Sequence, residues 1–432
     1  MARFLDASAN DFERSFVELL AAKRESAADV DDAVAKIIAD VRARGDAALR
    51  EYSLRFDRID FAGVGLQVSA AEIDAAVAAC SREQLAALRL AHERIGAYHL
   101  RQAPKDELFT DALGVKLGWR WRAIESVGLY VPGGLASYPS SVLMNAAPAK
   151  VAGVSRIAMV APAPEGRLTP LVLAAAQIAG VDEIYRVGGA QAIAALAYGT
   201  ATIAPVVKIV GPGNAYVAAA KRRVFGVVGI DMIAGPSEVV VLADAAADAR
   251  YVAADLLAQA EHDEAAQSIL ITDDMRFARL VDEEVAKQLS RLPREKIAGA
   301  SWRDYGAIIL VKRLADAVAL IDRLAPEHLE IIAADAEALS AAVRNAGAIF
   351  LGAYTPEAIG DYVGGSNHVL PTSRSARFSS GLGVYDFVKR TSILSCDAAS
   401  LKVLGPAAVT LGEAEGLSAH ARSVAMRLDD LR

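Results

Sequence analysis

The chain has 432 residues, a formal net charge of −7 and a hydrophobic content of 54 %. Single hydrophobic cores stop growing at roughly 250–300 residues, so we expect more than one domain. The acidic balance argues against nucleic-acid binding, which needs a basic surface. Charged residues interrupt every long apolar stretch, which argues against a membrane span.

The start of the chain, residues 1–6, has no apolar signal core, so we expect a cytoplasmic protein. The cysteines, Cys80 and Cys396, lie far apart in the sequence. They provide neither a disulfide framework nor a paired thiolate motif for zinc. Any bound metal must therefore use nitrogen and oxygen ligands.

The first predicted elements are helices. Apolar residues recur at helical spacing from Val34 to Val41, and the charge-rich stretch that continues to about Arg101 has the pattern of surface helices. His92 and His99 lie in this stretch together with arginines. We expect both histidines at the surface.

From residue 126 the pattern changes to short β-rich runs that alternate with Ala-rich helices. Strands separated by helices of this length indicate βαβ units around buried parallel sheets. The centre of the chain therefore predicts two α/β units in tandem. Their strands are predicted at 127–131, 157–160, 184–187 and 206–210, and then at 238–242, 268–272, 307–311, 329–332 and 348–351.

After Gly360 the alternation of strands and helices stops. The chain becomes rich in Gly, Ser and Asn before a final helix that is predicted to start near Gly416. Long irregular segments in compact enzymes tend to be functional. A tail of this kind can also reach a partner subunit.

Three loops that contain glycine follow predicted strands, at residues 130–134, 187–191 and 210–214. In open α/β sheets ligands bind beyond the carboxyl ends of the strands, and glycine lets the backbone approach a phosphate. The set favours a nucleotide-like ligand. None of the loops is a GxGxxG motif, and each alone is compatible with a plain strand-to-helix turn.

Gln259 and His262 are candidate metal ligands because their i, i+3 spacing puts them on one face of a helix. The alternative is a polar helix end, since glutamine is an uncommon zinc ligand. Further candidates follow at Asp361, His368 and His420, where mixed imidazole, carboxylate and amide ligation suits zinc. Spacing alone does not select among them.

Glu327 and His328 follow Pro326, which ends the preceding helix, and they lie in a turn that enters a strand. A carboxylate and an imidazole at one site can serve two proton transfers, because histidine titrates near neutrality and burial raises the pKa of a glutamate. An exposed turn is the alternative. Ser237 lacks the GxSxG surroundings of a hydrolase nucleophile, which leaves a hydrogen bond to substrate as its candidate role.

Several motifs follow one another in a fixed order, at residues 130–134, 138–145, 211–217, 229–232, 234–238, 259–263, 325–330, 367–372 and 415–417, with His420 beyond them. Together they resemble the histidinol dehydrogenase family from about residue 30 to the C-terminus. Their combination and order are more specific than any single motif.

The resemblance implies a set of ligands and contacts. Gln259, His262, Asp361 and His420 would bind zinc, one ion per subunit, and His368 would lie outside the metal shell. The substrate would contact these four ligands together with Ser237, His328 and Glu415, and NAD would contact Tyr130, Gln191 and Asn214.

The resemblance also implies the fold: two tandem incomplete Rossmann-like domains with parallel sheets and small N- and C-terminal extensions. Residues 26–129 and 237–380 would form the first domain with the metal and catalytic residues, and residues 130–236 the second with the NAD site. Residues 1–25 and 381–432 would be the extensions. The enzyme would be a homodimer in which Glu415 and His420 act on the partner's site.

The implied reaction converts L-histidinol, two NAD and water into L-histidine and two NADH through L-histidinaldehyde, the final steps of histidine biosynthesis. Zinc would anchor the imidazole and the amine of the substrate. His328 would take the alcohol proton, and Glu327 would activate water to hydrate the aldehyde.

Three other functions compete with this one. A related dehydrogenase for another small polyol, such as a sulfonated propanediol, is disfavoured because Glu415 suits a cationic amino alcohol. A zinc hydrolase that uses Glu327 is disfavoured by the glycine loops. A binding module without catalysis is disfavoured because many polar groups converge in irregular segments.

Overall fold

The computed structural model describes residues 2–22, 29–133 and 138–431. These residues form two compact units, one of Met1–Gln102 with Glu125–Asp386 and one of Ala103–Ile124 with Phe387–Arg432. We call them unit 1 and unit 2 and describe each by itself. Gly134 of the first predicted glycine loop, and the predicted boundary between residues 25 and 26, lie outside the described residues.

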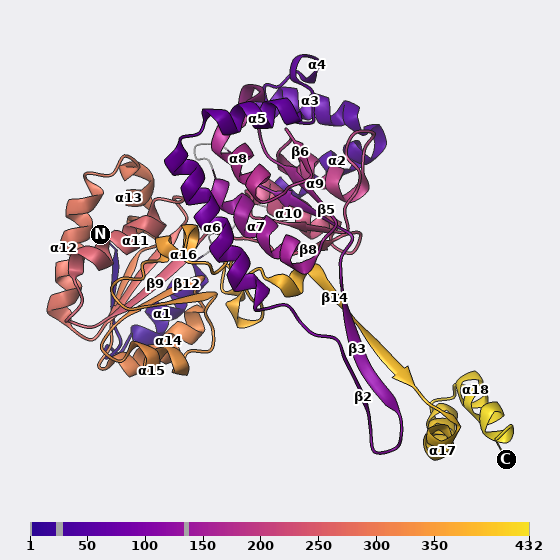
Figure 1. Ribbon diagram of the computed structural model, residues 1–432. Helices are drawn as coiled ribbons and strands as arrows, with labels where there is room; N and C mark the ends of the chain where they lie inside the picture. The colour runs from indigo at the N-terminus through magenta and orange to yellow at the C-terminus, as the bar shows by residue number, and fades with distance from the viewer. Residues whose placement is uncertain (1, 23–28, 134–137, 432) are drawn as a thin grey trace. The chain divides into compact units, whose positions relative to one another are not determined.

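Unit 1 contains a six-stranded sheet in which neighbouring strands are parallel, in the order β1-β11-β10-β9-β12-β13 (Figure 1). Its strands β9, β10 and β12 are buried along their whole length, as expected for a parallel sheet covered on both faces. The strands are β1 (Arg3–Asp6), β9 (Glu238–Ala243), β10 (Gln267–Thr272), β11 (Ala307–Leu310), β12 (His328–Ile332) and β13 (Ala348–Leu351).

Helices cover both faces of this sheet. On one face α1 (Phe12–Ala21), α14 (Ala317–Leu324) and α15 (Ala336–Ala342) pack on a shared core, and on the other face α11 (Ala249–Ala260), α12 (Met275–Leu289) and α13 (Glu295–Asp304) form a second core. The short helix α16 (Glu357–Tyr362) follows β13 and contacts α11. Both faces of the central strands β9, β10 and β12 are thus removed from water.

A second parallel sheet in unit 1 has the order β6-β5-β4-β7-β8. The chain moves outward from β4 to β5 and β6, and then returns to the other side of β4 with β7 and β8. The strand order therefore reverses between β4 and β7, which is where doubly wound sheets bind ligands. The strands are β4 (Ser126–Tyr130), β5 (Arg156–Val160), β6 (Glu183–Tyr185), β7 (Lys208–Val210) and β8 (Gly229–Ile230).

The helices around this second sheet come from two parts of the chain. The later part contributes α7 (Pro139–Ala152), α8 (Pro170–Ile178), α9 (Gly189–Tyr198) and α10 (Ala215–Val224). The earlier part contributes α2 (Asp29–Arg44), α3 (Asp46–Asp57), α4 (Phe61–Val64), α5 (Ala70–Ala79) and α6 (Arg82–Leu100). Helix α2 packs on α9 and α10, α5 packs on α8, and α6 packs on α7.

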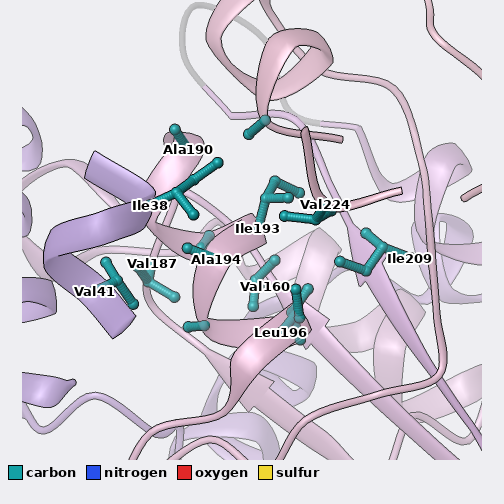
Figure 2. Packing of buried hydrophobic residues seen from close by; sticks show 14 of the residues in the cluster. Ile38, Val41, Val160, Val187, Ala190, Ile193, Ala194, Leu196, Ile209 and Val224 are labelled. Carbon is teal, nitrogen blue, oxygen red and sulfur yellow. The ribbon is translucent and has the colours of Figure 1, made fainter. Parts of the chain in front are cut away.

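Figure 2 shows the contact between α2 and α9, in which Ile38 lies near Ala190 and Ala194, and Val41 lies beside Val187 just before α9. The small alanine side chains of α9 let the larger residues of α2 approach closely. This packing associates α2 with the five-stranded sheet. The domain boundaries proposed from the sequence stay a prediction.

The prediction that His99 lies at the surface is wrong. Helix α6 buries Leu88, Ala91 and Ile95 on one face, and His99 is the next residue of the same helical stripe. Its Nδ1 lies 2.9 Å from Oε1 of Gln102, and its Nε2 lies 3.2 Å from Nδ2 of Asn367. His92 is half-buried.

Unit 2 consists of an antiparallel sheet in the order β14-β3-β2 and two helices that pack on each other. The elements are β2 (Glu107–Thr110), β3 (Lys116–Ala123), β14 (Val388–Ser395), α17 (Ala398–Ala414) and α18 (Ser418–Asp429). The final predicted helix corresponds to α18. The prediction of a long irregular segment after Gly360 is partly wrong, because β14 and α17 lie there.

Short 3-10 helices complete the described elements, at Pro164–Gly166, Leu314–Asp316, Ser375–Arg377 and Val384–Phe387. Among the helices of the described residues, none combines the length and the apolar content that a membrane crossing would require.

Candidate active site

A cleft of about 770 Å³ in unit 1 brings most of the predicted site residues together. Its walls include Pro132 and Gly133, which follow β4, and residues 212–214, which follow β7. Both groups lie beyond the carboxyl ends of these strands. The walls also include Ser237, Glu327 and His328, which lie at the amino ends of β9 and β12. The remaining predicted members that line it are Asn214, Gln259, His262 and Asp361.

The Glu327–His328 pair is buried, with 6 % of the surface of Glu327 and 5 % of that of His328 exposed, so it is not an ordinary exposed turn. Before the pair, helix α14 ends at Leu324 and is capped by Ala325, whose φ of 44° lies in the left-handed region. The Oε2 atom of Glu327 accepts a hydrogen bond of 3.1 Å from the backbone N–H of Glu238. Burial raises the pKa of Glu327 to about 7, against the opposing effect of His328. A carboxylate of this pKa can accept and release a proton near neutrality.

The orientation of the His328 ring follows from one contact. Its Nδ1 lies 3.1 Å from the carbonyl oxygen of Glu238, which can only accept a hydrogen bond, so Nδ1 carries the proton. Its Nε2 is buried and has no hydrogen-bond partner among the described residues. In its neutral form the ring therefore presents Nε2 as a proton acceptor.

Carboxylates surround this imidazole. The Nδ1 atom lies 3.9 Å from Oε2 of Glu327 and 3.7 Å from Oε2 of Glu357, and Nε2 lies 3.7 Å from Oδ1 of Asp361. Burial lowers the pKa of His328, but these carboxylates together raise it well above its usual value. The surroundings thus stabilise the protonated form of His328, which is the form that results when the ring accepts a proton.

The three predicted metal ligands of unit 1 offer three kinds of donor. Gln259 on α11 is buried, and its Oε1 has no hydrogen-bond partner among the described residues. Burial raises the pKa of Asp361, but the imidazoles of His328, His368 and His262 lower it below its usual value, so it is a carboxylate. Removal of water by the surrounding protein lowers the pKa of His262 and favours its neutral form.

These donors fit a zinc ion, because a buried amide oxygen without a partner is costly unless a cation or a donor meets it. No cluster of three His, Cys, Asp or Glu side chains capable of holding a metal ion occurs within the described part of the chain. The other predicted ligand, His420, lies in α18 of unit 2 and is exposed there, as is Glu415 at the end of α17.

The residues predicted to contact NAD occupy two kinds of position. Asn214 lines the cleft and caps α10, because its Oδ1 accepts hydrogen bonds from the N–H groups of Tyr216 and Val217. Tyr130 and Gln191 are buried and are not among the described residues that line the cleft. The Tyr130 hydroxyl accepts a hydrogen bond of 3.1 Å from Gly189 N–H, and burial raises its pKa to about 12.

Sequence reasoning missed a cluster of buried carboxyl groups next to His328. Glu330 on β12 accepts a hydrogen bond of 2.6 Å at Oε1 from the N–H of Glu357, the first residue of α16. Burial raises the pKa of Glu330 to about 9, of Glu357 to about 8 and of Asp255 on α11 to about 6. The available signal was a glutamate two residues after His328, on the same face of a buried strand.

Glu330 makes the stability of the protein depend on pH. Between pH 4.5 and about 9 the folded chain keeps a proton on Glu330 that the unfolded chain releases, so stability falls as the pH rises. We expect Glu330→Gln, which keeps the hydrogen bond to Glu357, to flatten this fall by at most about 1.4 kcal/mol per pH unit. Thermal unfolding at pH 5, 7 and 9 tests this, and parallel curves for both proteins would contradict it.

Comparison with known proteins assigns the chain to one family. The family model for histidinol dehydrogenase matches residues 20–428. The chain belongs to the histidinol dehydrogenase family. The histidinol dehydrogenase of Bradyrhizobium diazoefficiens is 68 % identical over 425 residues, covering 98 % of this chain and 99 % of the relative. That of Rhizobium meliloti is 65 % identical over 426 residues, covering 99 % and 98 %.

The fold agrees with this assignment. The crystal structure of histidinol dehydrogenase from Elizabethkingia anophelis has a TM-score of 0.95 to this chain at 35 % identity, and the match covers 100 % of this chain and 98 % of that one. The predicted family and the predicted α/β fold with two parallel sheets are confirmed. The chain is an oxidoreductase of the histidinol dehydrogenase family, as the sequence predicted.

Proposed function

We propose that the chain oxidises L-histidinol to L-histidine through L-histidinaldehyde, with two molecules of NAD, as the final steps of histidine biosynthesis. Membership of the histidinol dehydrogenase family supports this reaction. The observation that carries the assignment of the site is the buried Glu327–His328 pair, which faces the same cleft as Gln259, His262 and Asp361.

Gln259, His262 and Asp361, with His420, would hold one zinc ion per subunit. The unpartnered Oε1 of Gln259 supports this set, since nothing in the described protein satisfies it. When bound, zinc supplies a positive charge that fixes the imidazole and the amine of the substrate. Tyr130, Gln191 and Asn214 would hold NAD, which supplies the acceptor for the hydride.

In the first oxidation His328 accepts the proton of the substrate hydroxyl at Nε2. The Glu238 carbonyl holds Nδ1–H, so the ring is fixed in the tautomer that this step needs. The carboxylate of Asp361 stabilises the imidazolium that forms, because its Oδ1 lies 3.7 Å from Nε2. The product of this step is the aldehyde.

Between the two oxidations Glu327 accepts a proton from water as the water oxygen adds to the aldehyde carbon. Its pKa of about 7 suits a general base near neutral pH. Before the second oxidation His328 releases its first proton to water; it then accepts a proton from the hydrated aldehyde, the hydride would pass to the second NAD, and the carboxylic acid results. Ser237 lies at the start of β9 on the wall of the cleft, where its hydroxyl would hydrogen-bond the substrate.

We further propose that the enzyme is a homodimer in which Glu415 and His420 of unit 2 complete the site of the partner subunit. The three candidate ligands of unit 1 leave a tetrahedral ion one ligand short, which supports a contribution from unit 2. A carboxylate such as Glu415 suits the cationic amine of histidinol. An anionic polyol would instead require an added Arg or Lys.

Removal of the metal tests the proposed reaction. We expect purified protein to form two NADH per L-histidinol. A chelator should abolish this activity, because the substrate is no longer anchored without the metal, and added zinc should restore it. NADH absorbance at limiting histidinol gives the ratio. No NADH under any metal condition would disprove the proposal, and one NADH per histidinol would disprove the second oxidation.

A further inference from the structure

A buried ion pair adjoins the cleft, and the catalytic scheme gives it no role. Lys221 on α10 and Asp231 after β8 contact each other with 2 % and 1 % of their side chains exposed. Both residues form part of the cleft wall. A buried ion pair is weak evidence for stability, because removing two charges from water costs as much as their attraction returns. The other hydrogen bonds that Lys221 and Asp231 make therefore indicate the role of the pair.

The hydrogen bonds of the pair converge on Gly211. The Nζ of Lys221 donates a hydrogen bond of 3.0 Å to the carbonyl oxygen of Gly211. The Oδ2 of Asp231 accepts a hydrogen bond of 2.7 Å from the N–H of the same glycine, and its Oδ1 accepts one of 2.6 Å from Met232 N–H. The pair thus holds both backbone polar groups of one loop residue.

Gly211 opens the loop of residues 211–214 between β7 and α10, in a conformation that other residues rarely adopt. Its φ is 108°, and a Cβ atom there would overlap the backbone carbonyl oxygen of Tyr130 at the end of β4. Glycine permits this close approach, but it also has the most backbone freedom to lose. The hydrogen bonds from Lys221 and Asp231 therefore matter more for fixing the conformation of this loop than they would for a loop without glycine.

The position of this loop matters for ligand binding. It lies where the strand order reverses between β4 and β7, and it ends at Asn214, which caps α10 and lines the cleft. A displaced Gly211 would shift Asn214, three residues later, relative to the loop that follows Tyr130. Residues 212–214, together with Pro132 and Gly133 after Tyr130, line this part of the cleft.

We propose that Lys221 and Asp231 are positioning residues that hold the loop of residues 211–214 in the shape that binds the dinucleotide. The inference rests on the proposed use of NAD and adds residues that act on the cofactor through Gly211 and Asn214. The pair touches neither the catalytic residues nor the metal ligands in any described hydrogen bond. It therefore affects cofactor affinity and leaves histidinol binding unchanged.

The test compares NADH binding at equilibrium in folded variants. We expect Lys221→Met, and the double variant Lys221→Met with Asp231→Asn, to raise the dissociation constant for NADH about tenfold or more, because binding must then order the loop. Fluorescence titration without histidinol gives this constant, and calorimetry gives histidinol affinity in the zinc-loaded protein. The double variant leaves no buried unpaired charge, so it keeps the test valid if Lys221→Met fails to fold.

The matched control is the ion pair of Arg156 and Glu183, which joins β5 to β6 at 2.8 Å and lies outside the cleft wall. We expect Arg156→Met to leave NADH binding unchanged. Equal NADH affinity of the unaltered chain and the double variant would overturn the inference alone, as would an equal loss of histidinol binding. Absence of NADH binding by the unaltered chain would overturn the proposed cofactor as well.

Discussion

Glu327→Gln is expected to slow the oxidation of L-histidinaldehyde to L-histidine by about 10²–10⁴-fold, the usual contribution of a general base. The oxidation of L-histidinol to the aldehyde should fall much less, because that step does not consume water. Glutamine keeps the size of the side chain and can still accept the hydrogen bond from Glu238 N–H, but it cannot take a proton. The rate of NADH formation from each substrate separately measures the two effects.

Glu357→Gln is the matched control for this substitution. Glu357 is also a buried carboxyl group with a raised pKa, and its Oε2 lies 3.7 Å from Nδ1 of His328, but it does not line the cleft. We expect any effect of its loss to fall on both oxidations in similar proportion, because Glu357 acts only through His328. If Glu327→Gln also slows both steps equally, its assignment to water is wrong.

His328→Asn is expected to slow both oxidations by about 10²–10⁴-fold, because Nε2 of His328 is the proposed proton acceptor in each. Zinc content should stay the same, since His328 is not among the proposed ligands. The rates with L-histidinol and with L-histidinaldehyde, together with metal analysis, measure these outcomes. Retention of either oxidation at the normal rate would show that another group accepts that proton.

His368→Asn is the matched control for His328→Asn, because it makes the same substitution at another histidine of the cleft. The Nε2 of His368 lies 3.5 Å from Oγ of Ser141, and the proposed scheme gives it neither a proton transfer nor the metal. We expect both rates to change far less than with His328→Asn. An equal loss would place the proton acceptor in doubt, and a loss of zinc would add His368 to the ligands.

Much of the fold could be predicted from the sequence because parallel strands buried on both faces leave continuous apolar runs. The strands that escaped prediction lack this signal. Strand β1 has four residues and pairs with β11 far along the chain, and β8 has two residues. Strand β14 is exposed along most of its length, and Gly405, Pro406 and Gly412 interrupt the helical pattern of α17.

The candidate site was less accessible to sequence reasoning than the fold. The pattern around Glu327 and His328 predicted a turn that enters a strand, but it could not decide whether the pair is buried. The carboxyl groups of Asp255, Glu330 and Glu357 come from three elements, and only tertiary packing brings the three together. Their raised pKa values depend on that burial and have no local signal.

Strand β1 also bears on the order in which the molecule assembles. Residues 3–6 leave the ribosome long before residues 307–310, with which they pair in parallel. The strands of the five-stranded sheet all lie between residues 126 and 230, so that sheet has its complete set of strands much earlier. Because a nascent chain emerges from its N-terminal end, β1 stays unpaired throughout this interval. Strand β1 is therefore made early and is among the last strands to find its partner.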